Sequence, residues 1–153
     1  MTSDIKEIVV PVDFSPTSDR ALDYAVDFAK KLGARLTLVH AYELPVYGFP
    51  DGALVASAEV AGRILSSAQA GLLAAIEKRK DSGVEMRSIL RDGPPAEEVA
   101  AVAKQVHADM VILGTHGRTG LRRAIMGSVA EEVIRACECP VLAIHDPVPA
   151  SKK

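Results

Sequence analysis

Short apolar segments alternate along this chain with longer segments in which apolar residues recur every three or four positions. The short segments, rich in Val, Ile and Leu, are typical of buried β-strands, and the longer recurrence is typical of one face of a helix. The predicted strands cover residues 5–12, 35–42, 84–91, 109–113 and 140–145. The predicted helices cover residues 15–33, 55–81 and 128–137, and one more begins after the turn at 92–95.

Several of these elements carry signals for their ends. Ser15 and Pro16 suit the N-cap and the first position of a helix, and Gly33 suits the left-handed residue that closes one. Ser82 and Gly83 follow the second helix in the same way. Residues 43–52 contain two prolines and two glycines without periodicity, so we expect a surface loop there.

The alternation of strands and helices indicates an α/β fold. We expect one domain with a doubly wound five-stranded parallel sheet and helices on both faces. Right-handed crossovers restrict the strand order, and we expect the order 3-2-1-4-5. In that order the first and fourth strands are neighbours, and ligands of such sheets bind beyond the carboxyl ends of the strands where the order reverses.

Length and composition fit a single globular domain. The chain has 153 residues, of which 48% are hydrophobic and 25% are charged. We expect the domain to cover residues 1–147, followed by a polar tail at 148–153. A net charge of −2 offers no general attraction to nucleic acid or to an anionic membrane.

No targeting or membrane signal stands out in the sequence. The longest uncharged apolar-rich stretch, residues 64–76, is shorter than the ~18 residues that span a bilayer, and the N-terminus does not resemble a signal peptide. Cys137 and Cys139 lack the spacing of redox or zinc motifs, and we expect two reduced thiols. We therefore expect a soluble cytoplasmic protein.

Two features follow strands that should be neighbours in the sheet. Asp13 ends the first strand, and a glycine-rich segment from Gly114 to Gly127 follows the fourth. Glycine amides that turn inward, together with the start of a helix at Ser128, would suit a phosphate group. A second interpretation is that Ser128 and Glu131 form a capping box that only begins the helix.

The glycine segment differs from two common phosphate-binding motifs. It has neither the Walker pattern nor G-x-G-x-x-G. Arg118, Arg122 and Arg123 supply positive charge on the segment. Its spacing is G-x2-G-x9-G-S, formed by Gly114, Gly117, Gly127 and Ser128.

This spacing resembles the nucleotide-binding branch of the universal stress protein family. The resemblance covers nearly the whole chain and includes residues 8–15, 38–41, 113–117, 127–129 and 139–142. It implies that ATP, ADP or AMP is bound. By resemblance, Pro11, Asp13 and the backbone of Ala41 would hold the adenosine end, with Val12 beside them, and Leu113 and Gly114 would follow the ribose.

By the same resemblance, the phosphates would be held by the backbone amides of Gly117, Gly127, Ser128 and Val129 and by the Ser128 hydroxyl. Arg118 would lie nearby. Asp13 has three interpretations: it accepts a hydrogen bond from the ribose, it holds Mg²⁺ through water, or it caps the turn before the helix at Ser15. We also predict that Gly127→Val would block the phosphate and leave the sheet intact.

The four histidines point to no catalytic cluster. His116 lies in the expected phosphate loop, where it either contacts a phosphate or is solvated, and the solvated state is the commoner one. We expect His40 to be a hydrogen-bonded interior residue and His107 and His145 to lie at the surface. The spacing of Cys137, Cys139 and His145 does not suit a metal site.

The fifth strand is expected at an edge of the sheet. Val141, Leu142, Ala143 and Ile144 carry no charge and no proline that would prevent pairing with another strand. Pairing with a second copy of the same strand would remove this exposed edge, and the resemblance implies the same homodimer.

These observations favour an ATP-binding regulatory module of the stress response that hydrolyses ATP slowly or not at all. The absence of an evident water-positioning base and of a lysine in the loop argues against fast hydrolysis. One alternative is an ATP-dependent transferase or ATPase on the same fold, which would need an acceptor pocket. Another is a phospho-receiver domain, but Asp13 has no acidic partner in sequence and the fifth strand has no lysine.

Overall fold

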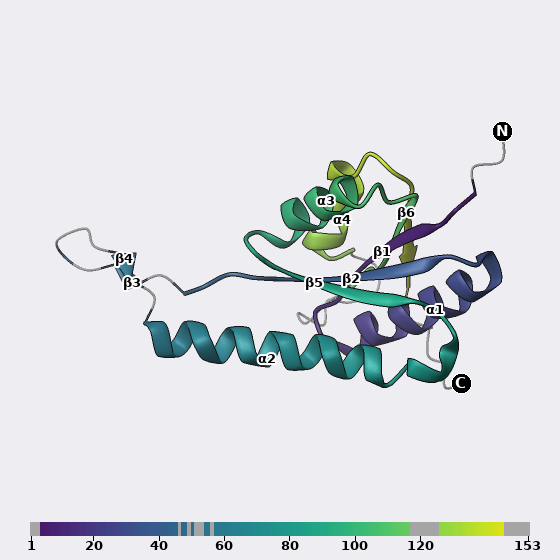
Figure 1. Cartoon of the computed structure of the whole chain (residues 1–153). Helices are drawn as coiled ribbons and strands as arrows, with labels where there is room; N and C mark the ends of the chain where they lie inside the picture. The colour runs from purple at the N-terminus through teal and green to yellow at the C-terminus, as the bar shows by residue number, and fades with distance from the viewer. Residues whose placement is uncertain are drawn as a thin grey trace, which may run out of the picture.

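The computed structural model describes residues 4–45, 47–48, 50, 54–55, 57–116 and 126–145, and it has the α/β fold (Figure 1). A five-stranded sheet has the order β5-β2-β1-β6-β7, which is 3-2-1-4-5 when its strands are counted along the chain. All four pairs of neighbouring strands are parallel. The strands are β1 (Glu7–Pro11), β2 (Arg35–Tyr42), β5 (Met86–Asp92), β6 (Met110–Gly114) and β7 (Val141–Ile144).

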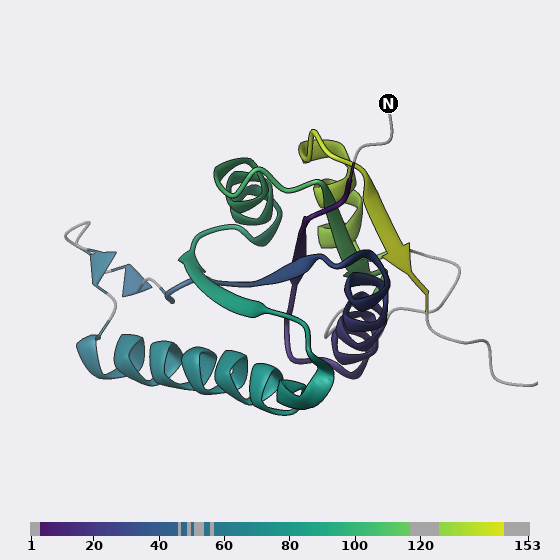
Figure 2. The ribbon, with the colours of Figure 1, turned by 45° about the vertical axis from the view of Figure 1, so that its right-hand side comes forward.

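Two helices cover each face of the sheet (Figures 1 and 2). On one face lie α1 (Pro16–Leu32) and α2 (Ala58–Glu77), and on the other lie α3 (Pro95–Gln105) and α4 (Ser128–Ala136). The period of two along the strands explains the two cores. Ile8 and Val10 face α1 and its neighbours, whereas Val9 between them packs with residues of α3 and α4.

The first helix is bounded by the residues that the sequence indicated. Ser15 is the N-cap and accepts a hydrogen bond from the Ser18 amide at 3.2 Å, and Pro16 begins the helix. Gly33 closes it with a φ of 66°, a left-handed conformation that glycine adopts without steric cost.

The segment between β2 and α2 differs from the predicted loop. It contains a two-stranded antiparallel pair, β3 (Tyr47–Gly48) and β4 (Leu54–Val55), which Figure 1 shows set apart from the sheet. Because Val55 pairs with Tyr47, α2 begins three positions later than predicted, after the N-cap Ser57. The helix ends at Glu77, earlier than predicted, and a 3₁₀ turn, Lys80–Ser82, leads to the left-handed Gly83.

Candidate functional site

The turn from β1 into α1 is held by a set of local hydrogen bonds. The Ser15 amide donates to Oδ1 of Asp13 at 2.9 Å, and the Asp13 amide donates to Oγ of Ser18 at 3.1 Å. Between them, Phe14 adopts a φ of 65°, which is unfavourable for a residue with a side chain. Asp13 therefore does cap this turn, as one of its three interpretations predicted, and the bonds fix the direction of its carboxylate.

A cleft of about 330 Å³ opens beyond the carboxyl ends of β1, β2 and β6, where the strand order reverses. We call it the central cleft. Nine of the eleven residues predicted for the nucleotide site line it: Pro11, Val12, Asp13, Ala41, Leu113, Gly114, Gly127, Ser128 and Val129. The other two, Gly117 and Arg118, lie outside the described residues, as do Arg122 and Arg123.

The first turn of α4 presents its backbone to this cleft. Gly127 is the N-cap, and no side chain caps the helix. The first amide bonded within the helix is that of Glu131, which donates to the Gly127 carbonyl at 3.1 Å. The amides of Ser128, Val129 and Ala130 have no hydrogen-bond partner among the described residues. Free amides at the positive end of a helix form a binding site for an anion.

The predicted capping box is therefore wrong. Ser128 is the first residue of α4 and not its N-cap, because the extended residue before the helix is Gly127. The Ser128 side chain is exposed and lines the central cleft. Its hydroxyl is thus placed to meet a ligand instead of closing the helix.

Both described glycines of the motif are required by close backbone packing. A Cβ on Gly114 would lie 2.9 Å from Cγ2 of Thr17 and 3.2 Å from its carbonyl oxygen, so glycine lets α1 approach β6. A Cβ on Gly127 would lie 3.0 Å from the Thr115 carbonyl oxygen, to which the Gly127 amide donates at 2.7 Å. Two expectations change as a result: the Gly127 amide is engaged, and Gly127→Val would disturb the backbone at Thr115 as well as a ligand.

Three titratable side chains line the central cleft within the described part of the chain. Besides Asp13 they are His40, whose Nδ1–H donates to the Val12 carbonyl at 2.7 Å, and His116, whose Nδ1 lies 3.1 Å from Oγ1 of Thr115. His40 is the hydrogen-bonded residue that was expected. His116 is buried, with 6% of its surface exposed, and is not a solvated loop residue.

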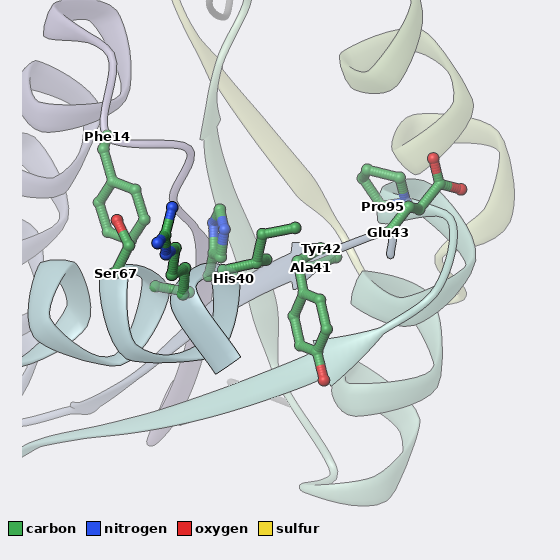
Figure 3. A pocket seen from close by; sticks show the side chains of 10 residues that line it. Phe14, His40, Ala41, Tyr42, Glu43, Ser67 and Pro95 are labelled. Atoms are coloured by element: carbon green, nitrogen blue, oxygen red, sulfur yellow. The ribbon is translucent and has the colours of Figure 1, made fainter. Parts of the chain in front are cut away.

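A second depression, which we call the side hollow, adjoins the central cleft. Figure 3 shows side chains that line the side hollow. It has a volume of about 560 Å³ and lies between the end of β2 and helix α2. Its polar and aromatic lining comes from Phe14, His40, Tyr42, Glu43, Arg63 and Ser67. His40, Ala41 and Pro95 line both depressions, so the end of β2 forms part of the wall between them.

The two cysteines are free and half-buried, in agreement with the prediction of reduced thiols. Burial, with a smaller effect of Cys139, raises the pKa of the Cys137 thiol to about 11. Burial also raises the pKa of Cys139. Because thiolates are the reactive form, both residues are poor nucleophiles at neutral pH. His107 and His145 are exposed, as expected.

Some lining residues were not predicted from the sequence. Pro95 and Val99, at the start of α3, line the central cleft, as does Thr115. The sequence did contain a signal that places these residues at the cleft. The turn before α3 follows β5, and in the predicted strand order the end of β5 lies beside the end of β2. The order of the strands, and not a motif, therefore brings α3 to the site.

The described part of the chain contains neither a membrane-spanning helix nor a cluster of metal-binding side chains. None of the helices is both long and apolar enough to cross a bilayer. No group of three or more His, Cys, Asp or Glu side chains in the same part of the chain is arranged to hold a metal ion.

Comparison with known proteins identifies relatives over nearly the whole chain. The model of the universal stress protein family matches residues 4–145. Universal stress protein MJ0531 of Methanocaldococcus jannaschii is 33% identical over 144 residues, which cover 93% of this chain and 83% of that protein.

Solved structures show the same fold. That of MJ0577 from the same organism has a TM-score of 0.80 at 27% identity and covers 95% of this chain and 99% of its own. A universal stress protein solved in complex with cAMP has a TM-score of 0.69 at 26% identity, over 94% of this chain and 98% of its own.

Proposed function

The chain belongs to the universal stress protein family, and we propose that it binds an adenine nucleotide, ATP in the first place, in the central cleft. The observation that carries the proposal is the uncapped start of α4, whose first three amides have no partner among the described residues and open into a cleft at the switch point of the sheet. The cAMP complex of a relative supports the choice of an adenine nucleotide.

In this proposal the nucleotide is oriented as the resemblance to the family implies. The amides and hydroxyl at the start of α4 receive the phosphates, and the end of β2 at Ala41, with Pro11 and Pro95, receives the base. Leu113 and Gly114 lie along the ribose. Asp13 holds a ribose hydroxyl or, through water, a Mg²⁺ ion that the phosphates themselves bind. Gly117 and Arg118 complete the phosphate site in this proposal.

Regulation by occupancy, with slow hydrolysis or none, suits the described lining better than catalysis does. No lysine or arginine lines the central cleft among those residues, and each of its three titratable side chains already has a local contact. An acceptor pocket for a transferase would have to adjoin the phosphates. The side hollow shares residues with the base end of the cleft, but it contains no residue of α4.

We propose that the protein that responds to nucleotide binding is a cytoplasmic homodimer. Its two copies would pair through Val141, Leu142 and Ile144 of β7.

A thermal melt of the ligand-free protein tests the proposal. A ligand at 100 times its Kd adds ~2.7 kcal/mol to the free energy of unfolding, so Mg-ATP should raise the Tm by several degrees and GTP by much less. In the same sample, turnover of ATP should stay below about 1 s⁻¹, the low end of enzyme turnover. If no adenine nucleotide shifts the melt, the proposal is wrong.

A further inference from the structure

The side hollow combines an aromatic wall with one acidic and one basic side chain (Figure 3). We propose that it is a second binding site, separate from the central cleft, for a zwitterion with an aromatic body: a free aromatic amino acid. The proposal goes beyond nucleotide binding and does not depend on it.

The aromatic wall is held in place by the backbone around it. The ring of Phe14 packs on the ring of His40 in a tilted arrangement, with an interplanar angle of 35° and centroids 4.5 Å apart, and remains 38% exposed. It fits against α2 only because Gly71 has no side chain, since a Cβ there would lie 2.6 Å from Cζ of Phe14. A rigid, partly exposed ring is suited to stacking on the ring of a ligand.

Opposite charges line the same hollow. Glu43 is exposed and has no ion pair or hydrogen bond with another described residue. Arg63 pairs with Glu59 at 2.6 Å, but the two side chains are 77% and 76% exposed, and such pairs are weak. Arg63 can therefore exchange its partner for a ligand carboxylate, while Glu43 accepts hydrogen bonds from an ammonium group.

The balance of charge argues for a zwitterion over an anion such as a nucleotide. Glu43 would repel a phosphate, whereas a ligand with both charges satisfies both side chains. The hydroxyl group of Ser67 adds a neutral hydrogen-bonding position. Since Nδ1–H of His40 is committed to the Val12 carbonyl, Nε2 is the ring nitrogen left for the ligand. Figure 3 shows Phe14 and Ser67 toward one end of the hollow and Glu43 with Pro95 toward the other.

The chain offers a direct probe, because it contains no tryptophan. The fluorescence anisotropy and emission of free L-tryptophan can be followed as the protein is added, without nucleotide. We expect saturable binding of one tryptophan per chain. Tryptamine, which lacks the carboxylate, and indole-3-propionate, which lacks the ammonium group, should each bind about fivefold more weakly, since each loses one exposed ion pair.

Two variants connect each charge to its side chain. Arg63→Gln should weaken tryptophan and indole-3-propionate about fivefold and leave tryptamine unchanged, and Glu43→Gln should weaken tryptophan and tryptamine but not indole-3-propionate. Arg135→Gln is the matched control, because Arg135 is an exposed arginine paired with Glu131 four residues away. Glu132→Gln is the control for the acidic position, since Glu132 is exposed on the same helix.

The result that overturns the proposal is an unchanged tryptophan signal at millimolar protein, or an equal loss of affinity in the control variants. A thermal shift with ATP in protein that does not bind tryptophan would refute this site alone. Tryptophan binding in protein that no nucleotide stabilises would refute the proposed function alone.

Discussion

At the start of α4, two neighbouring residues differ in their contacts: Gly127 packs against the backbone and Ser128 is exposed. Gly127 allows the helix to approach the Thr115 carbonyl, and its own amide is used in that contact. Ser128 follows with an exposed side chain at the cleft and an amide that has no partner in the described part of the chain. A glycine motif of this kind therefore has a structural cause even without a ligand, and a test of binding must change a residue that does not pack.

Ser128 is that residue, and we predict that Ser128→Glu abolishes most phosphate binding without loss of stability. An acid in the first turn of a helix is favourable, so the Tm without ligand should stay equal or rise. The added charge faces the phosphates and should weaken ATP at least tenfold, which is about 1.4 kcal/mol. Calorimetric titration measures the affinity. Ser128→Gln supplies a side chain of the same size without charge, and equal affinities in the two variants would contradict the phosphate site.

At the scale of elements, few buried residues hold α2 against the sheet. Among its residues only Ala68 and Leu72 are buried. The contact of Gly71 with Phe14 adds shape complementarity near the middle of the helix. Beyond its end, Arg79 is 6% exposed and bonds to α1, with its side chain 2.7 Å from Oδ1 of Asp19 and 2.9 Å from Oδ1 of Asp23. Arg79 thus fastens α2 to α1.

We predict that Arg79→Met lowers the free energy of unfolding by about 2 kcal/mol, as expected for the loss of charge-assisted hydrogen bonds. The cost stays below that of a fully buried charge because Asp19 and Asp23 keep contact with water. Urea denaturation measures the change. The control is Arg63→Met, because Arg63 is an exposed arginine on α2. This variant should lower the free energy of unfolding by less than about 0.5 kcal/mol. Similar losses in both variants would refute the role of Arg79.

The contact between Arg79 and Asp19 also makes the stability of the fold depend on pH. Burial acts to raise the pKa of Asp19, but the hydrogen bonds and charges of Lys78 and Arg79 outweigh it and hold the pKa below its ordinary value of 3.8. A lowered pKa stabilises the fold above the ordinary value, and this contribution is lost as the pH falls through the folded value. The stability gap between the parent and Arg79→Met should therefore stay constant near neutral pH and narrow as the pH falls below 3.8 through the folded pKa of Asp19. A constant gap would exclude Asp19 as its source.

The ends of an element were predicted correctly where the signal lies in neighbouring residues, and wrongly where packing between distant residues decides. The bounds of β2 and the caps of α1 follow from short-range patterns, and both were predicted correctly. The start of α2 was not, because its alanine-rich pattern continues into the residues that pair as β4. The spacing of Ser128 and Glu131 fits two helix registers, and the packing of Gly127 on Thr115, which the sequence does not display, decides between them.

At the scale of the whole molecule, the two edges of the sheet differ. The edge strand β5 carries the charged residues Arg87, Arg91 and Asp92, and α2 packs against it. The other edge, β7, has four uncharged, half-buried residues. Thr115 beside the central cleft donates its amide to the Ile144 carbonyl at 3.0 Å, so β7 is bonded to a cleft residue. A dimer formed through β7 would therefore adjoin the proposed nucleotide site.

The ladder of β7 shows which backbone groups would pair with a second copy. The Pro140 and Ile144 carbonyls accept bonds from Val111 and Thr115, so by alternation the backbone of Ala143 faces away from β6. Ala143→Pro removes the outward amide without breaking the ladder to β6, and proline is tolerated in edge strands. We predict that light scattering after gel filtration gives twice the chain mass of 16.2 kDa for the parent and the single mass for this variant. Ala143→Ser, which keeps the amide, should stay dimeric. A monomeric parent, or a dimeric Ala143→Pro, would place any assembly elsewhere.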